Sequence, residues 1–194
     1  MAAFADIELD PQTTMGLQRG DRTAQADAYR LLAPAILGLA QRILQDRGLA
    51  QEVLQDTFVE LLEQAGKLRS AEAVVGWLRK VAVNHCLMRL RSPWHKRRTS
   101  TFVEEAEDHV SSSQRMEGLS DVERALASLG PETRLVVWLH DVEGYTHKEI
   151  ASLTGHKPSY SKSQLARGYA KLLGEFGGSY EKATVSHIRP ACTS

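Results

Sequence analysis

Basic and short polar side chains recur at helical spacing near the end of this 194-residue chain, between residues 158 and 173. Lys and Arg neutralise phosphate groups, and shorter side chains between them can approach the base edges in a DNA groove. The candidate contacts in this segment are Tyr160, Lys162, Ser163, Ala166, Arg167 and Lys171. The chemistry predicted for these residues is therefore the non-covalent binding of double-stranded DNA.

The residues that precede this segment predict the turn that would present it. Thr146 and Glu149 have the spacing of a capping box at a helix start, and Gly155 can supply the positive φ that ends the helix. Pro158 suits the first turn of the next helix because its missing N–H costs nothing there. Residues 144–173 thus have the layout of a helix-turn-helix, whose second helix lies in the major groove. The alternative is an ordinary helical hairpin with a solvated basic face.

A second basic segment, residues 77–98, carries no acidic residue. Its bases are Arg79, Lys80, Arg89, Arg91, Lys96, Arg97 and Arg98. A cationic surface with hydrogen-bonding side chains suits single-stranded or distorted DNA. Asn84 and His85 supply such side chains, and Asn84 could bond a base edge; its alternative role is that of a capping or surface residue. The sequence therefore predicts a second DNA-binding surface, for unpaired DNA.

An acidic segment, residues 50–66, carries no base. Its acids are Glu52, Asp56, Glu60 and Glu63. The ordinary interpretation is a solvated helix face, and the sharper hypothesis is a docking surface for a basic protein partner. The formal net charge of zero is thus a sum of opposite blocks, and such segregated charge is more informative about partners than the total.

Good helix formers dominate the periodic segments, so we expect an all-α fold of two small helical domains. Residues 16–98 should form a bundle, with breaks at Gly48 and at Gly66 to Ser70, and with Pro34 in a first turn or at a kink. Residues 99–119 are acidic and poor in apolar side chains, which predicts a flexible linker; the alternative is a solvated helix in its first half. Four short helices should follow over residues 120–176. Residues 1–15 and 177–194 are expected to be an extension and a tail.

Several other functions are excluded by composition. Cys86 and Cys192 suggest no disulfide framework and, with the histidines near them, no credible zinc set. The N-terminus has no signal-peptide pattern, and no run of about 18 apolar residues exists, so we expect a cytoplasmic protein without a membrane span. No nucleophile–base set, phosphate loop or metal cluster is present in the sequence. We therefore expect neither an enzyme nor a cofactor, metal or small-molecule substrate.

Taken together, these motifs resemble the bacterial RNA polymerase sigma factors of the extracytoplasmic-function (ECF) group. The resemblance covers roughly residues 20–98 and 119–173. It is carried by Gly20-Asp21 with Tyr29, by AQEVLQDTF at residues 50–58, by WLRKVAVN at residues 77–84, and by ALASLGPETR at residues 125–134 before the helix-turn-helix.

The resemblance implies a role for each candidate residue. Contact with core RNA polymerase, direct or supporting, falls to Glu52, Gln55, Asp56 and Phe58. The unpaired −10 promoter element falls to Lys80, Asn84, His85 and Arg91, with Arg69 and Ser70 on a loop that helps to hold an extruded base. The −35 element falls to the helix-turn-helix residues named above.

Some positions depart from the family pattern. Tyr160 and Ser161 replace the usual Thr and Val, and Gly168-Tyr169 interrupts a typical Ala-Arg. These changes predict either an unusual −35 preference or a less stable recognition helix, because a mid-helix Gly costs about 1 kcal/mol. Ser70-Ala71 replaces a common Gly-Asp pair, which puts the base preference of that loop in question.

The function expected from these residues is transcription initiation: docking on core RNA polymerase, anchoring of the −35 duplex and capture of the melted −10 strand. The two-domain form also permits an anti-sigma protein as a partner. Two alternatives remain open. One is a dimeric helix-turn-helix regulator that binds DNA without polymerase, and the other is a sigma-like decoy that sequesters an anti-sigma protein.

Overall fold

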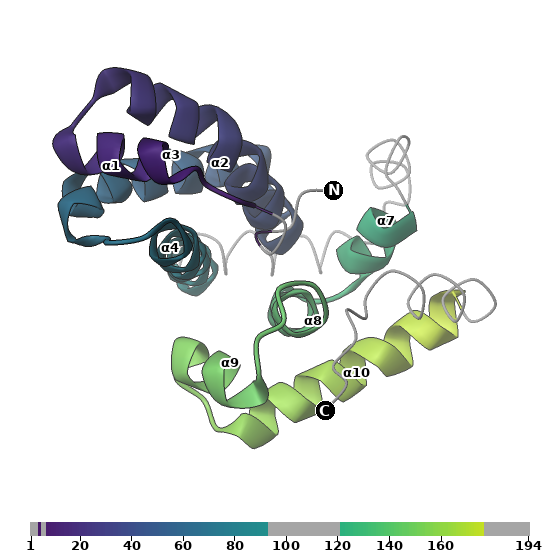
Figure 1. Cartoon of the computed structure of the whole chain (residues 1–194). Coiled ribbons are helices and arrows are strands. Elements are labelled where there is room, and N and C mark those ends of the chain that lie inside the picture. Colours follow the sequence, from purple (N-terminus) through teal and green to yellow (C-terminus); the bar gives the residue numbers. More distant parts are fainter. Residues whose placement is uncertain (1–3, 5–6, 93–120, 177–194) are drawn as a thin grey trace. The chain divides into compact units, whose positions relative to one another are not determined.

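The computed structural model describes residue 4, residues 7–92 and residues 121–176 (Figure 1). Contacts divide the chain into two compact units, Met1–His95 and Lys96–Ser194, which are treated separately below. Every regular element among the described residues is helical, so the expected all-α fold is confirmed. None of these helices has the length and apolar character needed to cross a bilayer. The expected linker at 99–119 and the tail at 177–194 lie outside the described residues.

The described residues of the first unit include four α-helices and a short 3₁₀ turn. They are α1 (Pro11–Arg19), α2 (Arg22–Leu44), α3 (Arg47–Gln64), the 3₁₀ turn η2 (Ala65–Lys67) and α4 (Ala71–Arg91). Each α-helix begins at a side chain that accepts a hydrogen bond from a backbone N–H of its first turn. These N-caps are Asp10, Asp21, Asp46 and Ser70. Short polar residues therefore determine where the helices of this unit begin.

The expected break at Gly48 was wrong, Pro34 does not lie in a first turn, and the helical region begins earlier than Gly16. Gly48 lies inside the first turn of α3, because the Asp46 carboxylate accepts from the Leu49 N–H at 3.0 Å and begins the helix before it. Pro34 lies in the middle of α2, which continues through it. Buried apolar side chains on both sides of Pro34 hold α2 against the core, so packing offsets the lost backbone hydrogen bond. The break predicted at Gly66 to Ser70 is present as η2 and the cap of α4.

The core of the first unit lies between α2, α3 and α4. The largest fully buried side chains are Leu32, Ile36, Leu39 and Ile43 of α2, Val53 and Leu61 of α3, and Val74, Leu78 and Val83 of α4. Helix α2 packs against α1, α3 and α4, and α3 packs against α4. Each helix buries one apolar stripe, so its opposite face is exposed and available for contact with a partner.

The second unit contains the four expected short helices. They are α7 (Asp121–Ser128), α8 (Pro131–Val137) continued by the π-helical turn η3 (Trp138–Val142), α9 (His147–Thr154) and α10 (Pro158–Phe176). The capping box is present: the Thr146 N–H donates to the Glu149 carboxylate at 2.8 Å, and the Glu149 N–H donates to Thr146 Oγ1 at 3.3 Å. Gly155 ends α9 with φ of 73°. The helix-turn-helix layout is therefore formed by α9 and α10.

At Gly168, α10 approaches α8 too closely for a side chain to fit without strain. A Cβ atom built on Gly168 would lie 2.7 Å from Val137 Cγ2 and 3.1 Å from Thr133 Cγ2. The sequence suggested that this glycine either weakens α10 or contributes to an unusual −35 preference. In the structure it permits the contact that holds α10 to α8.

Gly168→Ala should lower the free energy of unfolding of the second unit by about 1–2 kcal/mol, because overpacking outweighs the better helix propensity of Ala. Gly174→Ala is the matched control, since it lies in the same helix and its Cβ would meet nothing within 4 Å. Thermal unfolding followed by circular dichroism measures both. An unchanged or raised midpoint for Gly168→Ala would contradict the close approach described here.

Candidate nucleic-acid and protein interfaces

Helix α10 presents one exposed face. Lys162, Ser163, Ala166 and Arg167 are all exposed on it, whereas Ser161, Gln164, Leu165, Gly168 and Leu172 are buried. Side chains three and four residues apart are neighbours on a helix surface, and these four residues are connected by such spacings. Four of the six residues predicted for duplex contact therefore lie together, with two cations flanking two short side chains.

The other two predicted residues, Tyr160 and Lys171, also make contacts within the unit. The Tyr160 hydroxyl donates to the Glu132 carboxylate, and its ring lies 4.1 Å from the His156 ring between centroids. Burial and the Glu132 contact raise the pKa of Tyr160 to about 12. The Lys171 ammonium donates to the Ser128 backbone oxygen at 2.6 Å. Their polar atoms are thus engaged by α7 and α8, and a role in DNA binding remains a prediction.

Residues that depart from the family pattern anchor α10 from behind. Ser161 is fully buried, with its Oγ 3.0 Å from His147 Nδ1, and the Tyr169 hydroxyl donates to Asp141 at 2.7 Å. The His147 ring stacks on that of His140, with centroids 4.5 Å apart. Burial raises the pKa of Asp141 and, together with the nearby charges of His140 and Lys162, lowers the pKa of His147. These polar contacts fix the back of α10 to η3 and α9.

Helix α4 presents a second exposed stripe. Lys80, Asn84 and Arg91 are exposed along it at helical spacing. Met88 lies between Asn84 and Arg91 and is 64% exposed. Sequence reasoning missed Met88, although its position four residues after Asn84 was a usable signal. The stripe therefore combines cations, an amide and one apolar side chain.

The loop before α4 carries the other two residues predicted for the −10 element. Arg69 and Ser70 are both exposed. Ser70 Oγ accepts a hydrogen bond from the Ala73 N–H at 3.1 Å, so this hydroxyl caps α4. Ser70 therefore has a structural role as the N-cap of α4, and its contact with DNA remains a prediction.

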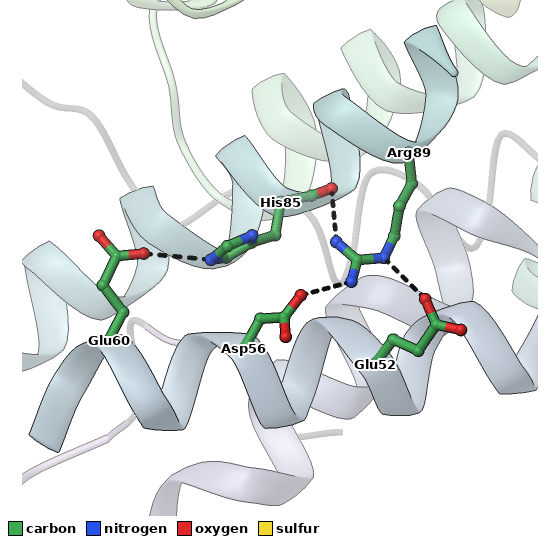
Figure 2. Close-up of polar contacts among 5 residues, drawn as sticks. All are labelled: Glu52, Asp56, Glu60, His85 and Arg89. Atoms are coloured by element: carbon green, nitrogen blue, oxygen red, sulfur yellow. Dashed lines mark hydrogen bonds and ion pairs between the residues drawn. The ribbon is translucent and has the colours of Figure 1, made fainter. Parts of the chain in front are cut away.

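The acidic residues of α3 face basic residues of α4 (Figure 2). Arg89 Nη2 donates to Asp56 Oδ2 at 2.6 Å, and Arg89 Nε lies 3.5 Å from Glu52 Oε2. His85 Nε2 lies 3.1 Å from Glu60 Oε2. Two blocks of opposite charge that are well separated in the sequence thus pair across the helix interface.

This pairing changes two expectations. His85 was predicted to contact DNA, but its ring is half-buried and turned to Glu60 rather than lying on the stripe of Asn84. The acidic face was interpreted as a solvated face or as a docking surface for a basic partner, and in the structure its Glu52 and Asp56 also share Arg89. Charge pairing between helices depends on their register, which charge counts in the sequence do not specify.

The outward face of α3 is more apolar than its charge suggested. Gln55 is exposed, and Val59 and Leu62 follow it at helical spacing with 57% and 45% of their surface exposed. Phe58 is buried, with its ring centroid 4.7 Å from that of Tyr29. Phe58 therefore supports α3 from inside, and Gln55 is the predicted residue that lies on the outward face.

Comparison with known proteins accounts for both units. Residues 28–97 match the sigma-70 region 2 family, and residues 119–172 match the sigma-70 region 4 family. The chain is 31% identical over 165 residues to the RNA polymerase sigma factor CarQ of Myxococcus xanthus, covering 80% of this chain and 92% of that protein. It is 31% identical over 153 residues to the ECF RNA polymerase sigma factor SigM of Mycobacterium tuberculosis, covering 79% and 77%. The RNA polymerase sigma-H factor of Pseudomonas aeruginosa is 28% identical over 159 residues, covering 75% and 82%.

The matched regions coincide with the structural division of the chain. Region 2 falls on the helices whose α4 carries the Lys80, Asn84 and Arg91 stripe, and region 4 falls on the unit that contains the helix-turn-helix. The similarity to CarQ extends over nearly all of that protein, so it is not confined to a shared DNA-binding motif. The chain belongs to the sigma-70 family of RNA polymerase sigma factors and, within it, to the extracytoplasmic-function group.

Proposed function

We propose that this sigma factor docks on core RNA polymerase through α3, anchors duplex −35 DNA through α10 and captures the unpaired −10 strand through α4. One observation carries the proposal: each unit presents an exposed cationic helix face, and the two faces differ in chemistry. On α10 the cations flank Ser163 and Ala166, which are short enough to approach base edges in a groove. On α4 they flank Asn84 and Met88, an amide and an apolar side chain that suit unstacked bases.

Run-off transcription with purified core polymerase on a library of genomic fragments tests the whole proposal. The expected result is a set of transcripts that depend on the added chain and share two promoter elements at a constant spacing. A gel shift without polymerase tests the rival regulator, since tight and specific duplex binding by the isolated chain would favour it. If the chain stimulates no transcript and binds no DNA in either assay, the sigma-like decoy that sequesters an anti-sigma protein would be the remaining hypothesis.

Lys162→Ala and Arg167→Ala should each weaken promoter binding by the assembled holoenzyme and lower the slope of log affinity against log salt by about 1, the loss of one phosphate contact. Arg124→Ala is the control, because this cation lies in the same unit on α7 and pairs with Asp121. Filter binding of a promoter fragment at several salt concentrations gives the slopes. An unaltered slope would remove the substituted residue from the interface.

Asn84→Ala should leave −35 contact intact but reduce strand opening by about tenfold, because only the unpaired strand would lose a hydrogen-bonding partner. Permanganate footprinting reports the melted bases, and protection of the −35 region reports anchoring. Gln12→Ala, an exposed polar residue on α1, is the control. A normal bubble in the Asn84 variant would refute its assignment to the −10 strand.

Docking on polymerase is assigned to the outward face of α3. An exposed apolar pair beside Gln55, edged by the carboxylates of Glu52 and Asp56, has the apolar centre and polar rim typical of protein interfaces. Nucleic acid is an unsuitable occupant because the rim is acidic. A protein surface that is apolar at its centre and basic at its edge is complementary.

Leu62→Ser should weaken binding to core polymerase by about tenfold, since an apolar contact at the centre of an interface is lost. Leu31→Ser is a close match as a control: Leu31 is 43% exposed against 45% for Leu62, but it lies on α2. Fluorescence anisotropy of the labelled full chain titrated with core polymerase measures both affinities. Equal losses for the two variants would show that α3 is not the specific dock.

A further inference from the structure

Arg89 is a basic residue of α4 that does not join the exposed stripe of Lys80, Asn84 and Arg91. Its side chain is only 16% exposed and turns toward α3 (Figure 2). Its Nη1 also donates back to the His85 backbone oxygen at 3.4 Å. Arg89 is thus held within the first unit, and a direct role in binding DNA does not fit its position.

The guanidinium of Arg89 bridges two carboxylates that lie one helical turn apart. Asp56 Oδ2 is 2.6 Å from Nη2, and Glu52 Oε2 is 3.5 Å from Nε. The contact with Asp56 is a hydrogen bond, and the contact with Glu52 is an ion pair. The planar guanidinium of Arg favours a defined orientation of the carboxylates beside it more than a Lys ammonium does. Only one oxygen of each carboxylate takes part in these contacts.

Without Arg89, the two carboxylates would lose the cation that lies between them. Like charges at a spacing of four residues repel, and both side chains are largely exposed, at 60% for Glu52 and 52% for Asp56. A partner that bound them without the bridge would have to restrict their rotamers on binding, which weakens the complex. With the bridge in place, that restriction is already present in the free protein.

We propose that Arg89 is a positioning residue for polymerase docking, which holds Glu52 and Asp56 so that their remaining oxygens meet basic side chains of the polymerase. This inference rests on the proposed docking through α3. The exposed carboxylates repel phosphates, so the partner is a basic protein surface and not DNA. Arg89 belongs to the DNA-facing helix but acts on the face of its neighbour.

The sign of the effect separates positioning from plain electrostatics. Removing the positive charge of Arg89 makes the α3 face more negative, and long-range attraction alone then predicts tighter binding to a basic partner. Positioning predicts weaker binding, because the carboxylates lose their fixed orientation. The two explanations therefore give opposite results for the same substitution.

The experiment measures the affinity of the full-length chain for core polymerase by fluorescence anisotropy. Arg89→Met keeps the length of the side chain and should bind about tenfold more weakly, while Arg89→Lys should recover only part of the loss. Arg30→Met is the control, because Arg30 is an exposed cation of α2 that pairs with Asp27. This substitution removes one positive charge but leaves the Arg89 bridge in place. Arg89→Met binding as tightly as the wild type, or more tightly, would overturn the inference.

A double-mutant cycle excludes a merely structural effect. In a Glu52→Gln, Asp56→Asn background, Arg89→Met should cause little further loss, because the residues that it positions are already neutral. A full additional loss would mean that Arg89 acts through general packing and would overturn the inference.

If Arg89→Met unfolds, as seen by circular dichroism, the same cycle is run with Arg89→Lys. Wild-type chain that fails to bind polymerase would overturn the proposed docking, and this inference with it, whereas normal wild-type binding with an unaffected Arg89 variant overturns this inference alone.

Discussion

The packing of α4 against α3 determines which charges of the first unit are available to a partner. Buried apolar residues such as Val53, Leu61, Leu78 and Val83 set the register of the two helices. That register turns Arg89 toward the acidic residues of α3 and leaves Lys80, Asn84 and Arg91 outside. Partly exposed ion pairs contribute little to stability, so the value of these pairs lies in orientation and in the separation of the two faces.

The same division between an internal and an external face governs the helix-turn-helix. Gly168 lets α10 lie close to α8, and Ser161 and Tyr169 bind the domain's own polar groups. The residues that depart from the family pattern at these positions therefore help to anchor α10. The exposed set of Lys162, Ser163, Ala166 and Arg167 lies outside that anchoring network, so these residues can vary at little cost to the fold.

The parts of this structure that follow from local signals could be predicted from the sequence. The capping box at Thr146 and the positive φ at Gly155 each depend on a few neighbouring residues, and both are present. Gly48 is not a break because the Asp46 cap begins α3 before it, and Pro34 lies inside α2, where distant packing on both sides supports the helix. The Arg89 bridge and the close approach at Gly168 depend on residues more than 30 positions apart in the chain. Such contacts are set by helix register, which neither composition nor periodicity specifies.

The two proposed DNA-binding faces lie on separate units, and this arrangement would have a consequence for specificity. Among the described residues, Lys162 and Arg167 flank the short side chains of the α10 face, and Lys80 and Arg91 flank the polar and apolar side chains of the α4 face. Because both faces belong to one chain, contact at one promoter element raises the effective concentration of the other face at its own element. The gain requires that the geometry permit both contacts at once, and a polymerase that holds the two units at a fixed separation would supply that geometry. Selectivity for promoters then arises from the joint requirement, and neither helix needs high affinity of its own.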